Sequence, residues 1–281
     1  HDDAHALRKA VSGRQQAVVI GGGYIGLEVA ASLTKLGLRV DVIEMADRLL
    51  ARVASPQISS FFAELHQSHD VGLHIGANCR EILQKDGAFT GVQLDDGRQI
   101  AAELLLVGIG VLPDLDLAAS AGIEAGNGIL VDAMMQSSVQ DIFAIGDVAL
   151  IDGAALRVES VDNAQMTAAR AAAAICGLAQ PSMAAPWFWS EQFDVRLQSA
   201  GIVPLASPDL RHQLRPGKRE GGFSVWSYDD KGKLAAVEAV RDPAGYMLGK
   251  KCLDLGLSPD PDDIGNCDFD LKAFVAAGNE K

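Results

Sequence analysis

The chain has 281 residues, an ordinary 48% of apolar residues and a formal net charge of −13 at pH 7. This length is enough for two domains, and the acidic balance argues against general binding to nucleic acid or to an anionic membrane surface. The most apolar stretch, 104–112, has the size of a strand, so no membrane span is predicted. The four cysteines form no C-x-x-C pair and the six histidines have no metal-ligand spacing, which predicts a reduced, cytoplasmic protein without a metal site.

A short helix is expected within residues 1–11, and the most informative segment follows it. Four apolar residues, 17–20, predict a strand that runs into Gly21, Gly23 and Gly26. In such a G-x-G-x-x-G pattern the first glycine permits a tight turn, the second lets the backbone approach a pyrophosphate, and the third lets helix pack on strand. The helix N-terminus then presents free N–H groups to the phosphates. The pattern predicts a dinucleotide site, the alternative being glycines that serve packing only.

The next predicted strand, 39–44, ends at Glu44, which lies 18 residues after Gly26. An acid near this spacing accepts the adenine-ribose hydroxyls of NAD. Because Glu44 would repel a 2′-phosphate, and the two residues after it offer that phosphate no cation, the sequence favours NADH over NADPH. Arg48 and Arg52 are close enough in sequence to leave the other preference open.

The rest of the chain alternates between helical and strand patterns. Gly108 and Gly110, in a predicted buried strand at 104–110, either admit the nicotinamide end of the cofactor or relieve packing. The other predicted elements are a helix at 55–68 capped by Ser55, short strands within 79–100, a strand at 129–132, a buried strand at 141–147, a helix at 163–175, a linker at 180–186, a hairpin of 223–228 and 234–240, and a helix at 243–255.

Four motifs, at 21–28, 107–113, 142–147 and 186–192, resemble in this order the flavin-dependent, NADH-using ferredoxin reductases of the pyridine nucleotide-disulfide oxidoreductase superfamily. The resemblance implies an α/β fold of the glutathione-reductase type. The expected parts are a linker helix at 1–11, a Rossmann-like NAD-binding domain at 12–126, the C-terminal part of a split FAD-binding domain at 127–183 and a reductase C-terminal α+β domain at 184–281. The family begins with a further segment whose own G-x-G-x-x-G binds the ADP half of FAD, so we expect a family member without its front.

The resemblance also implies roles for single residues. Glu28 would be catalytic, near the nicotinamide pocket, where its family counterpart pairs with a lysine of the front segment; an ordinary helix carboxylate is the alternative. Asp147 would bind a ribityl hydroxyl of FAD, and Trp189 would lie near the flavin or simply belong to the core. The residues expected to bind NAD or FAD are Gly21, Gly23, Tyr24, Ile25, Gly26, Glu44, Gly108, Gly110, Asp147, Val148, Glu159, Ser160, Val161 and Trp189.

The implied function is the passage of electrons from NADH through FAD to an acidic iron–sulfur carrier, either a [2Fe-2S] ferredoxin or a rubredoxin-type acceptor. The basic segment 211–219 would help to steer it, although a solvated loop is the simpler interpretation. Because the one fingerprint is assigned to NAD, little FAD is expected on these residues alone. The alternatives are an NAD-binding module without turnover, as in a truncated flavoprotein or a protein like apoptosis-inducing factor, or a relative of the NADH oxidases and peroxidases.

Overall fold

The computed structural model describes residues 2–154, 156–203 and 211–280. Its helices are α1 (Asp2–Ala10), α2 (Tyr24–Lys35), α3 (Pro56–Ser68), α4 (Asp116–Ser120), α5 (Val161–Ile175), α6 (Pro243–Leu255), α7 (Pro261–Gly265) and α8 (Leu271–Gly278), with a 3₁₀ turn, η1, at Gly146–Val148. Its strands are β1 (Gln16–Ile20), β2 (Arg39–Glu44), β3 (Gly72–Ile75), β4 (Cys79–Lys85), β5 (Ala88–Leu94), β6 (Gln99–Ala101), β7 (Leu104–Val107), β8 (Ile129–Val131), β9 (Ala149–Ile151), β10 (Trp187–Gln192), β11 (Val195–Gly201), β12 (Arg211–Pro216), β13 (Phe223–Tyr228) and β14 (Leu234–Val240). Among the described residues, no helix has the length and apolarity needed to cross a membrane.

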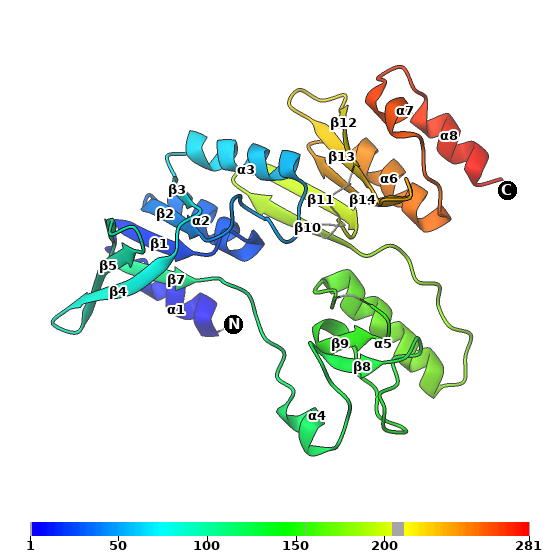
Figure 1. Cartoon of the computed structure of the whole chain (residues 1–281), viewed down its shortest axis with the longest axis horizontal. Coiled ribbons are helices and arrows are strands. Elements are labelled where there is room, and N and C mark those ends of the chain that lie inside the picture. Colours follow the sequence, from blue (N-terminus) through cyan, green and yellow to red (C-terminus); the bar gives the residue numbers. More distant parts are fainter. Residues whose placement is uncertain (1, 155, 204–210, 281) are drawn as a thin grey trace.

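The first unit is an α/β layer around a parallel sheet of order β3-β2-β1-β7 (Figure 1). Ala17, Val18 and Val19 of β1 are buried because neighbouring strands lie on both sides and α2 covers one face. The antiparallel sheet β4-β5-β6 packs Val92 and Leu94 against the other face. The sequence patterns therefore identified this alternation of strand and helix, including the short strands at 79–100.

The last strand of this sheet differs from its prediction. The buried strand predicted at 104–110 ends at Val107, and the side chains of Val107 and Ile109 are 55% and 64% exposed. The physical reason is its place in the sheet: β7 is an edge strand that pairs with β1 alone. Its apolar residues therefore have neighbours on one side only.

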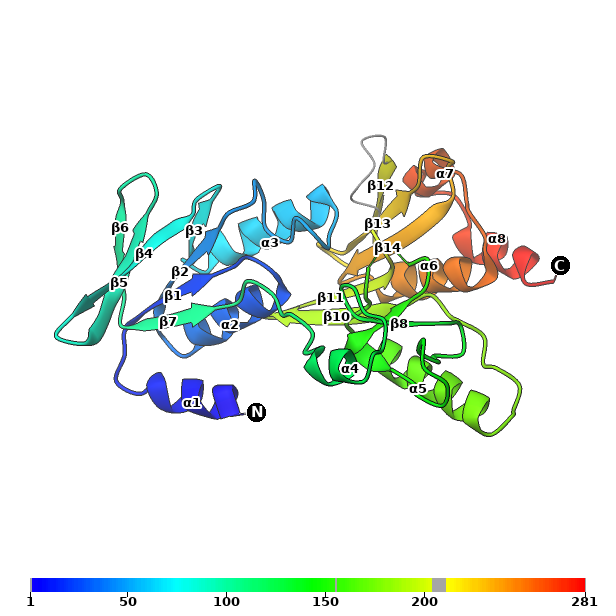
Figure 2. The ribbon, with the colours of Figure 1, turned by 60° about the horizontal axis from the view of Figure 1, so that its bottom comes forward.

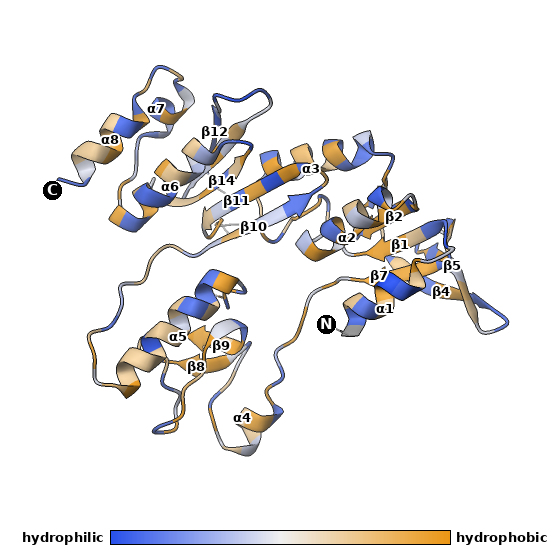
Figure 3. Cartoon of the chain, turned by 180° about the vertical axis from the view of Figure 1, so that it is seen from behind, coloured by the Kyte–Doolittle hydropathy of each residue, from blue (hydrophilic) through white to orange (hydrophobic). Residues whose placement is uncertain are grey.

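The second unit is small and consists of the parallel pair β8–β9, η1 and α5 around a core that includes Val131, Met135 and Ala144. Figure 3 shows apolar residues along β8, β9 and part of α5. The buried strand predicted at 141–147 is wrong. Only Phe143 makes a β-bridge, to Gln136, and Ile142 and Ile145 remain 36% and 43% exposed. Apolar content alone suggested a strand, but within the described residues no ladder continues along this segment.

The third unit is an antiparallel sheet of order β10-β11-β14-β13-β12, packed against α6, α7 and α8 (Figure 2). Its centre holds the fully buried Trp226 and Tyr228. The hairpin β13–β14 and the helix α6 have the predicted boundaries. The interpretation of the basic segment as a solvated loop is wrong for 211–216, which forms β12 and pairs with β13. The sequence patterns missed β10, β11, α7 and α8.

The first and third units share one hydrophobic core. Leu27 and Phe62 of the first unit pack in the same cluster as Val225 and Val240 of the third, and Figure 2 shows β10 beside α2. A continuous core of this kind resembles a domain interior cut in two rather than a loose contact between domains. The two units are therefore expected to hold a fixed orientation.

A buried carboxylate crosses the seam between these two units. Glu238 of β14 is 0% exposed, and its two oxygens accept from the backbone N–H of Ser55 at 3.2 and 3.1 Å. Ser55 stands at the N-cap of α3 as predicted, but its side chain makes no capping hydrogen bond to the helix. The acceptor for this N–H at the helix start is instead a carboxyl group from a strand 183 residues away.

We expect Glu238 to make the stability of the protein depend on pH. Burial raises the pKa of this carboxyl from 4.5 to about 7. An acid whose pKa is higher in the folded state than in the unfolded state loses stability as pH rises between these two values, here by about 3 kcal/mol. Glu238→Gln copies the protonated side chain. We expect the variant to unfold at higher urea than the parent at pH 8 and at similar urea at pH 4.5.

The matched control is Glu64→Gln, which makes the same substitution at an exposed glutamate of α3. It should leave the difference between the two pH values unchanged. A Glu238→Gln variant less stable than the parent by the same amount at both pH values would contradict the buried-charge explanation.

Candidate functional site

The glycine turn brings three backbone segments into contact. A Cβ on Gly21 would lie 2.3 Å from the carbonyl oxygen of Gly108, and a Cβ on Gly26 would lie 2.0 Å from that of Gly21. These two glycines therefore permit the approach of β1, α2 and β7. Gly23 differs, because a Cβ there would meet no atom within 4 Å. The space in front of the α2 N-terminus is open, which fits a pyrophosphate held by backbone N–H groups.

Glu44 lies at the end of β2, beside this turn. Its Oε2 accepts from the N–H of Gly22 at 2.6 Å, and its Oε1 accepts from that of Ala46 at 2.7 Å. A carboxylate has about four acceptor positions, so two donors leave room for ribose hydroxyls. The structure thus fixes the predicted acid at the carboxyl edge of the sheet, where a Rossmann-type cofactor binds.

The two arginines that left the cofactor preference open have different environments. The guanidinium of Arg48 donates to Ala51 O, Ala54 O and Ser59 Oγ at 3.0, 2.9 and 2.6 Å. Its hydrogen bonds therefore hold it against the loop before α3 and the first turn of that helix. Arg52 is exposed and donates to Ile109 O at 3.5 Å, on the side of the turn that carries Gly110.

The start of α2 faces the third unit. The ring of Tyr24 meets Phe188 edge-on, with centroids 4.8 Å apart. Burial, together with the charges of Glu238 and Glu28, raises the pKa of Tyr24 well above its ordinary value. Glu28 accepts a hydrogen bond from Ser190 of β10 at 2.6 Å. Ile25, between them in sequence, is 65% exposed at the open end of the helix.

The residues expected to contact FAD gather where η1 meets α5. Gly146 donates to the hydroxyl of Thr167 at 2.9 Å, which holds η1 against the helix. Ser160 caps α5 by accepting from the N–H of Asn163 at 3.1 Å. The structure therefore brings Asp147, Val148, Glu159, Ser160 and Val161 to one end of α5.

Sequence reasoning missed Arg157 at this end of α5. Its guanidinium pairs with Glu159 at 2.8 Å and donates to the carbonyl oxygen of Asp147. The only sequence signal was an arginine two residues before an expected flavin contact. Trp189 of β10 is 40% exposed, with the guanidinium of Arg196 lying 5.8 Å from its ring centroid. Because α5 contacts β10, the strand that carries Trp189 lies beside the helix.

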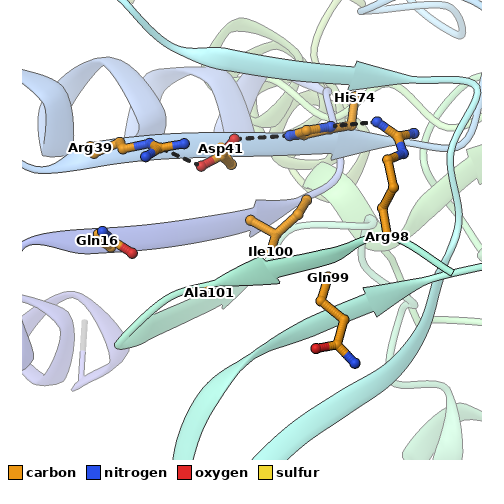
Figure 4. Close-up of a pocket in the computed structure, with 8 residues that line it drawn as sticks. All are labelled: Gln16, Arg39, Asp41, His74, Arg98, Gln99, Ile100 and Ala101. Atoms are coloured by element: carbon orange, nitrogen blue, oxygen red, sulfur yellow. Dashed lines mark hydrogen bonds and ion pairs between the residues drawn. The ribbon is translucent and has the colours of Figure 1, made fainter.

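A surface pocket of about 400 Å³ lies elsewhere, near the amino ends of β1 and β2 (Figure 4). Its polar groups bind one another: Asp41 accepts from His74 at 2.9 Å and pairs with Arg39 at 3.8 Å. Glu44 and the glycine turn lie at the opposite, carboxyl edge of the sheet, so this pocket is not the dinucleotide site. Among the described residues, no cluster suits a metal ion.

An open glycine turn, a carboxylate at the end of β2 and an open helix N-terminus are the features with which Rossmann-type domains bind dinucleotides. Residues 1–168 match the family described as pyridine nucleotide-disulphide oxidoreductase, and residues 187–275 match the one described as reductase C-terminal. The chain belongs to the pyridine nucleotide-disulphide oxidoreductase family and carries the reductase C-terminal domain.

Several ferredoxin reductases are similar over nearly the whole chain. The Ferredoxin--NAD(P)(+) reductase fdr of Sphingomonas sp. is 40% identical over 279 residues, which are 97% of this chain and 66% of the relative. The crystal structure of the ferredoxin reductase for the CYP199A2 system from Rhodopseudomonas palustris matches with a TM-score of 0.91 and 40% identity, over 98% of this chain and 68% of that one. The reductase in a covalent putidaredoxin reductase–putidaredoxin complex matches with a TM-score of 0.92 and 33% identity, over 100% of this chain and 68% of that one. The chain thus spans about two thirds of the length of these proteins.

The two helix-start glycines are expected to respond differently to alanine. Gly23→Ala places a methyl group in open space, so the protein should fold normally but bind NADH at least about tenfold more weakly. Gly26→Ala forces a methyl group onto the Gly21 carbonyl, and we expect it to destabilise the fold by roughly 3 kcal/mol as well as abolish binding. Thermal unfolding and NADH titration measure the two effects. Normal NADH affinity in Gly23→Ala would contradict this site.

Proposed function

We propose that this chain is the NADH-binding and electron-acceptor-facing part of an oxidoreductase that passes electrons from NADH through FAD to an acidic iron–sulfur carrier. The observation that carries the proposal is the held carboxylate of Glu44 beside an open glycine turn. The likeness to ferredoxin reductases over the whole chain supports the remainder. FAD, when bound, accepts the hydride of NADH and releases its electrons one at a time.

The chain's own residues bind and orient the cofactors. We assign the pyrophosphate of NAD to Gly21, Gly23 and the α2 N-terminus, and its adenine ribose to Glu44. Ile25, Gly108 and Gly110 would line the path of the nicotinamide half, and Tyr24 with Phe188 would exclude water behind it. We assign the flavin to the junction of η1, α5 and Trp189, which fits because the α5 N-terminus and exposed Val161 leave both donors and apolar surface uncovered. The same assignment keeps the domain boundaries predicted at 12–126, 127–183 and 184–281.

The proposed acceptor is a ferredoxin or a rubredoxin-type protein. Part of the basic segment is already engaged: Arg211 pairs with Asp262, and Arg215 donates to Ile264 O at 3.0 Å. Lys218 and Arg219 are exposed and left for steering a negatively charged partner. A reducing compartment such as the cytoplasm is part of the proposal, since all four cysteines are free thiols.

We expect NADH to bind at least about tenfold more tightly than NADPH, because Glu44 repels a 2′-phosphate and Arg48 is held by its own hydrogen bonds. Titration of each cofactor by nicotinamide fluorescence measures the ratio. Arg52→Ala is the control: its guanidinium lies by Ile109, so its removal should leave the ratio unchanged. Equal or tighter binding of NADPH would overturn the assignment of Glu44.

Flavin content tests the remainder of the proposal. The 281-residue chain has one G-x-G-x-x-G, so we expect it to bind NADH but to hold well under one FAD per chain. Joined to the remaining third of the Sphingomonas reductase, it should turn yellow and reduce a [2Fe-2S] ferredoxin with NADH. The same chimaera with Gly23→Ala should keep its flavin colour and lose turnover.

Two results would favour other functions. A chimaera that binds both cofactors but reduces no iron–sulfur protein would favour a non-catalytic NAD-binding module. Stoichiometric FAD and full turnover in the 281-residue chain itself would show that these residues bind the flavin pyrophosphate without a second G-x-G-x-x-G, and would overturn this part of the proposal.

A further inference from the structure

Three buried side chains and one carboxylate form a continuous hydrogen-bonded chain across the seam between the first and third units. His66 of α3 contacts Gln192 of β10, with Nε2 and Oε1 2.8 Å apart. Gln192 donates from Nε2 to the hydroxyl of Ser190 at 3.1 Å. Ser190 donates to Oε1 of Glu28 at 2.6 Å. The chain thus leaves the first unit at α3, passes along β10 and returns to the first unit at α2.

All the donors of this chain point toward Glu28. The Ser190 hydroxyl donates its one hydrogen bond to the carboxylate of Glu28, so it has only lone pairs to offer Gln192. The amide nitrogen of Gln192 must then face Ser190, and its oxygen faces His66. His66 therefore carries its hydrogen on Nε2, and its Nδ1 has no partner within the described residues. Burial lowers the pKa of His66, in agreement with a neutral ring.

Burial makes the geometry of the chain rigid. His66, Ser190 and Gln192 are each 0% exposed, and a buried polar group that loses its partner costs about 1–3 kcal/mol. Each link is therefore held by the next. The one end that reaches partly exposed surface is Glu28, whose Oε2 has no hydrogen-bond partner among the described residues. The hydrogen-bonded chain thus fixes the Glu28 carboxylate through Oε1 and leaves Oε2 available to another donor.

Glu28 lies near the open glycine turn, within the first two turns of α2. Tyr24 is the first residue of α2, directly after the open Gly23, and Glu28 follows one turn later on the same face of the helix. With the adenine ribose at Glu44 and the pyrophosphate at the turn, the nicotinamide half has to leave along this end of α2. Its carboxamide NH₂ is a donor that needs an acceptor there.

We propose that Ser190, Gln192 and His66 are positioning residues that hold Glu28 to accept from the nicotinamide carboxamide, so that the C-terminal domain completes the nicotinamide half-site. This inference rests on the proposed binding of NADH. It gives a role to three polar side chains that are fully buried at the seam.

The test compares NADH with ADP-ribose, which lacks the nicotinamide ring. Ser190→Ala should weaken NADH binding by about tenfold and leave ADP-ribose binding within about twofold. Glu28→Ala should do the same, and Ser190→Ala should have no further effect in the Glu28→Ala background, because the two residues act through one another. Ser32→Ala is the matched control: its hydroxyl donates to the backbone oxygen of Glu28, not to the carboxylate.

Each contrary result has a distinct meaning. Unchanged NADH affinity in Ser190→Ala, or an equal loss for NADH and ADP-ribose, would overturn the inference, the second result by showing a structural role only. Additive losses in the double variant would also overturn it. If the parent chain bound neither ligand, the proposed NADH site itself would fall.

Discussion

The backbone contacts among Gly21, Gly26 and Gly108 are the constraint on which the rest of the molecule depends. They hold the first turn of α2 against the ends of β1 and β7 at distances that no side chain at Gly21 or Gly26 would allow. This fixes where the helix N-terminus points relative to Glu44, and it sets the face of α2 that β10 meets. The proposed binding site and the domain seam are therefore built on the same helix, and a shift of α2 against the sheet would move both.

Elements set by local chemistry could be predicted from the sequence. The glycine fingerprint and the acid at the end of β2 have fixed spacing, because one cofactor has to bridge them. The hairpin β13–β14 follows from two largely apolar segments around the turn Asp229–Gly232. Pro243 marks the start of α6 because its ring suits a first helical position. In each case a fixed spacing or a turn residue in the sequence itself marks the element.

The seam could not be predicted in this way. Ser190 and Glu28 are separated by 162 residues, and Ser55 and Glu238 by 183. Nothing in the local pattern of β14 shows that a glutamate in a run of apolar residues faces a helix start in another unit. The failed strand at 141–147 has the converse cause, since an apolar run becomes a strand only where a neighbouring strand offers hydrogen bonds. Whether such a neighbour exists is a property of the assembled fold.

The two hydrogen bonds that Glu44 accepts bear on how the cofactor preference of such a site can evolve. The N–H groups of Gly22 and Ala46 converge on one carboxylate, so together they form a small anion seat that the protein fills with its own side chain. Loss of that side chain would leave two amide donors facing the ribose, with the geometry to receive phosphate oxygens. A switch from NADH to NADPH would then begin with the loss of the Glu44 carboxylate. A new arginine would only strengthen the preference for a phosphate that the two backbone N–H groups already provide.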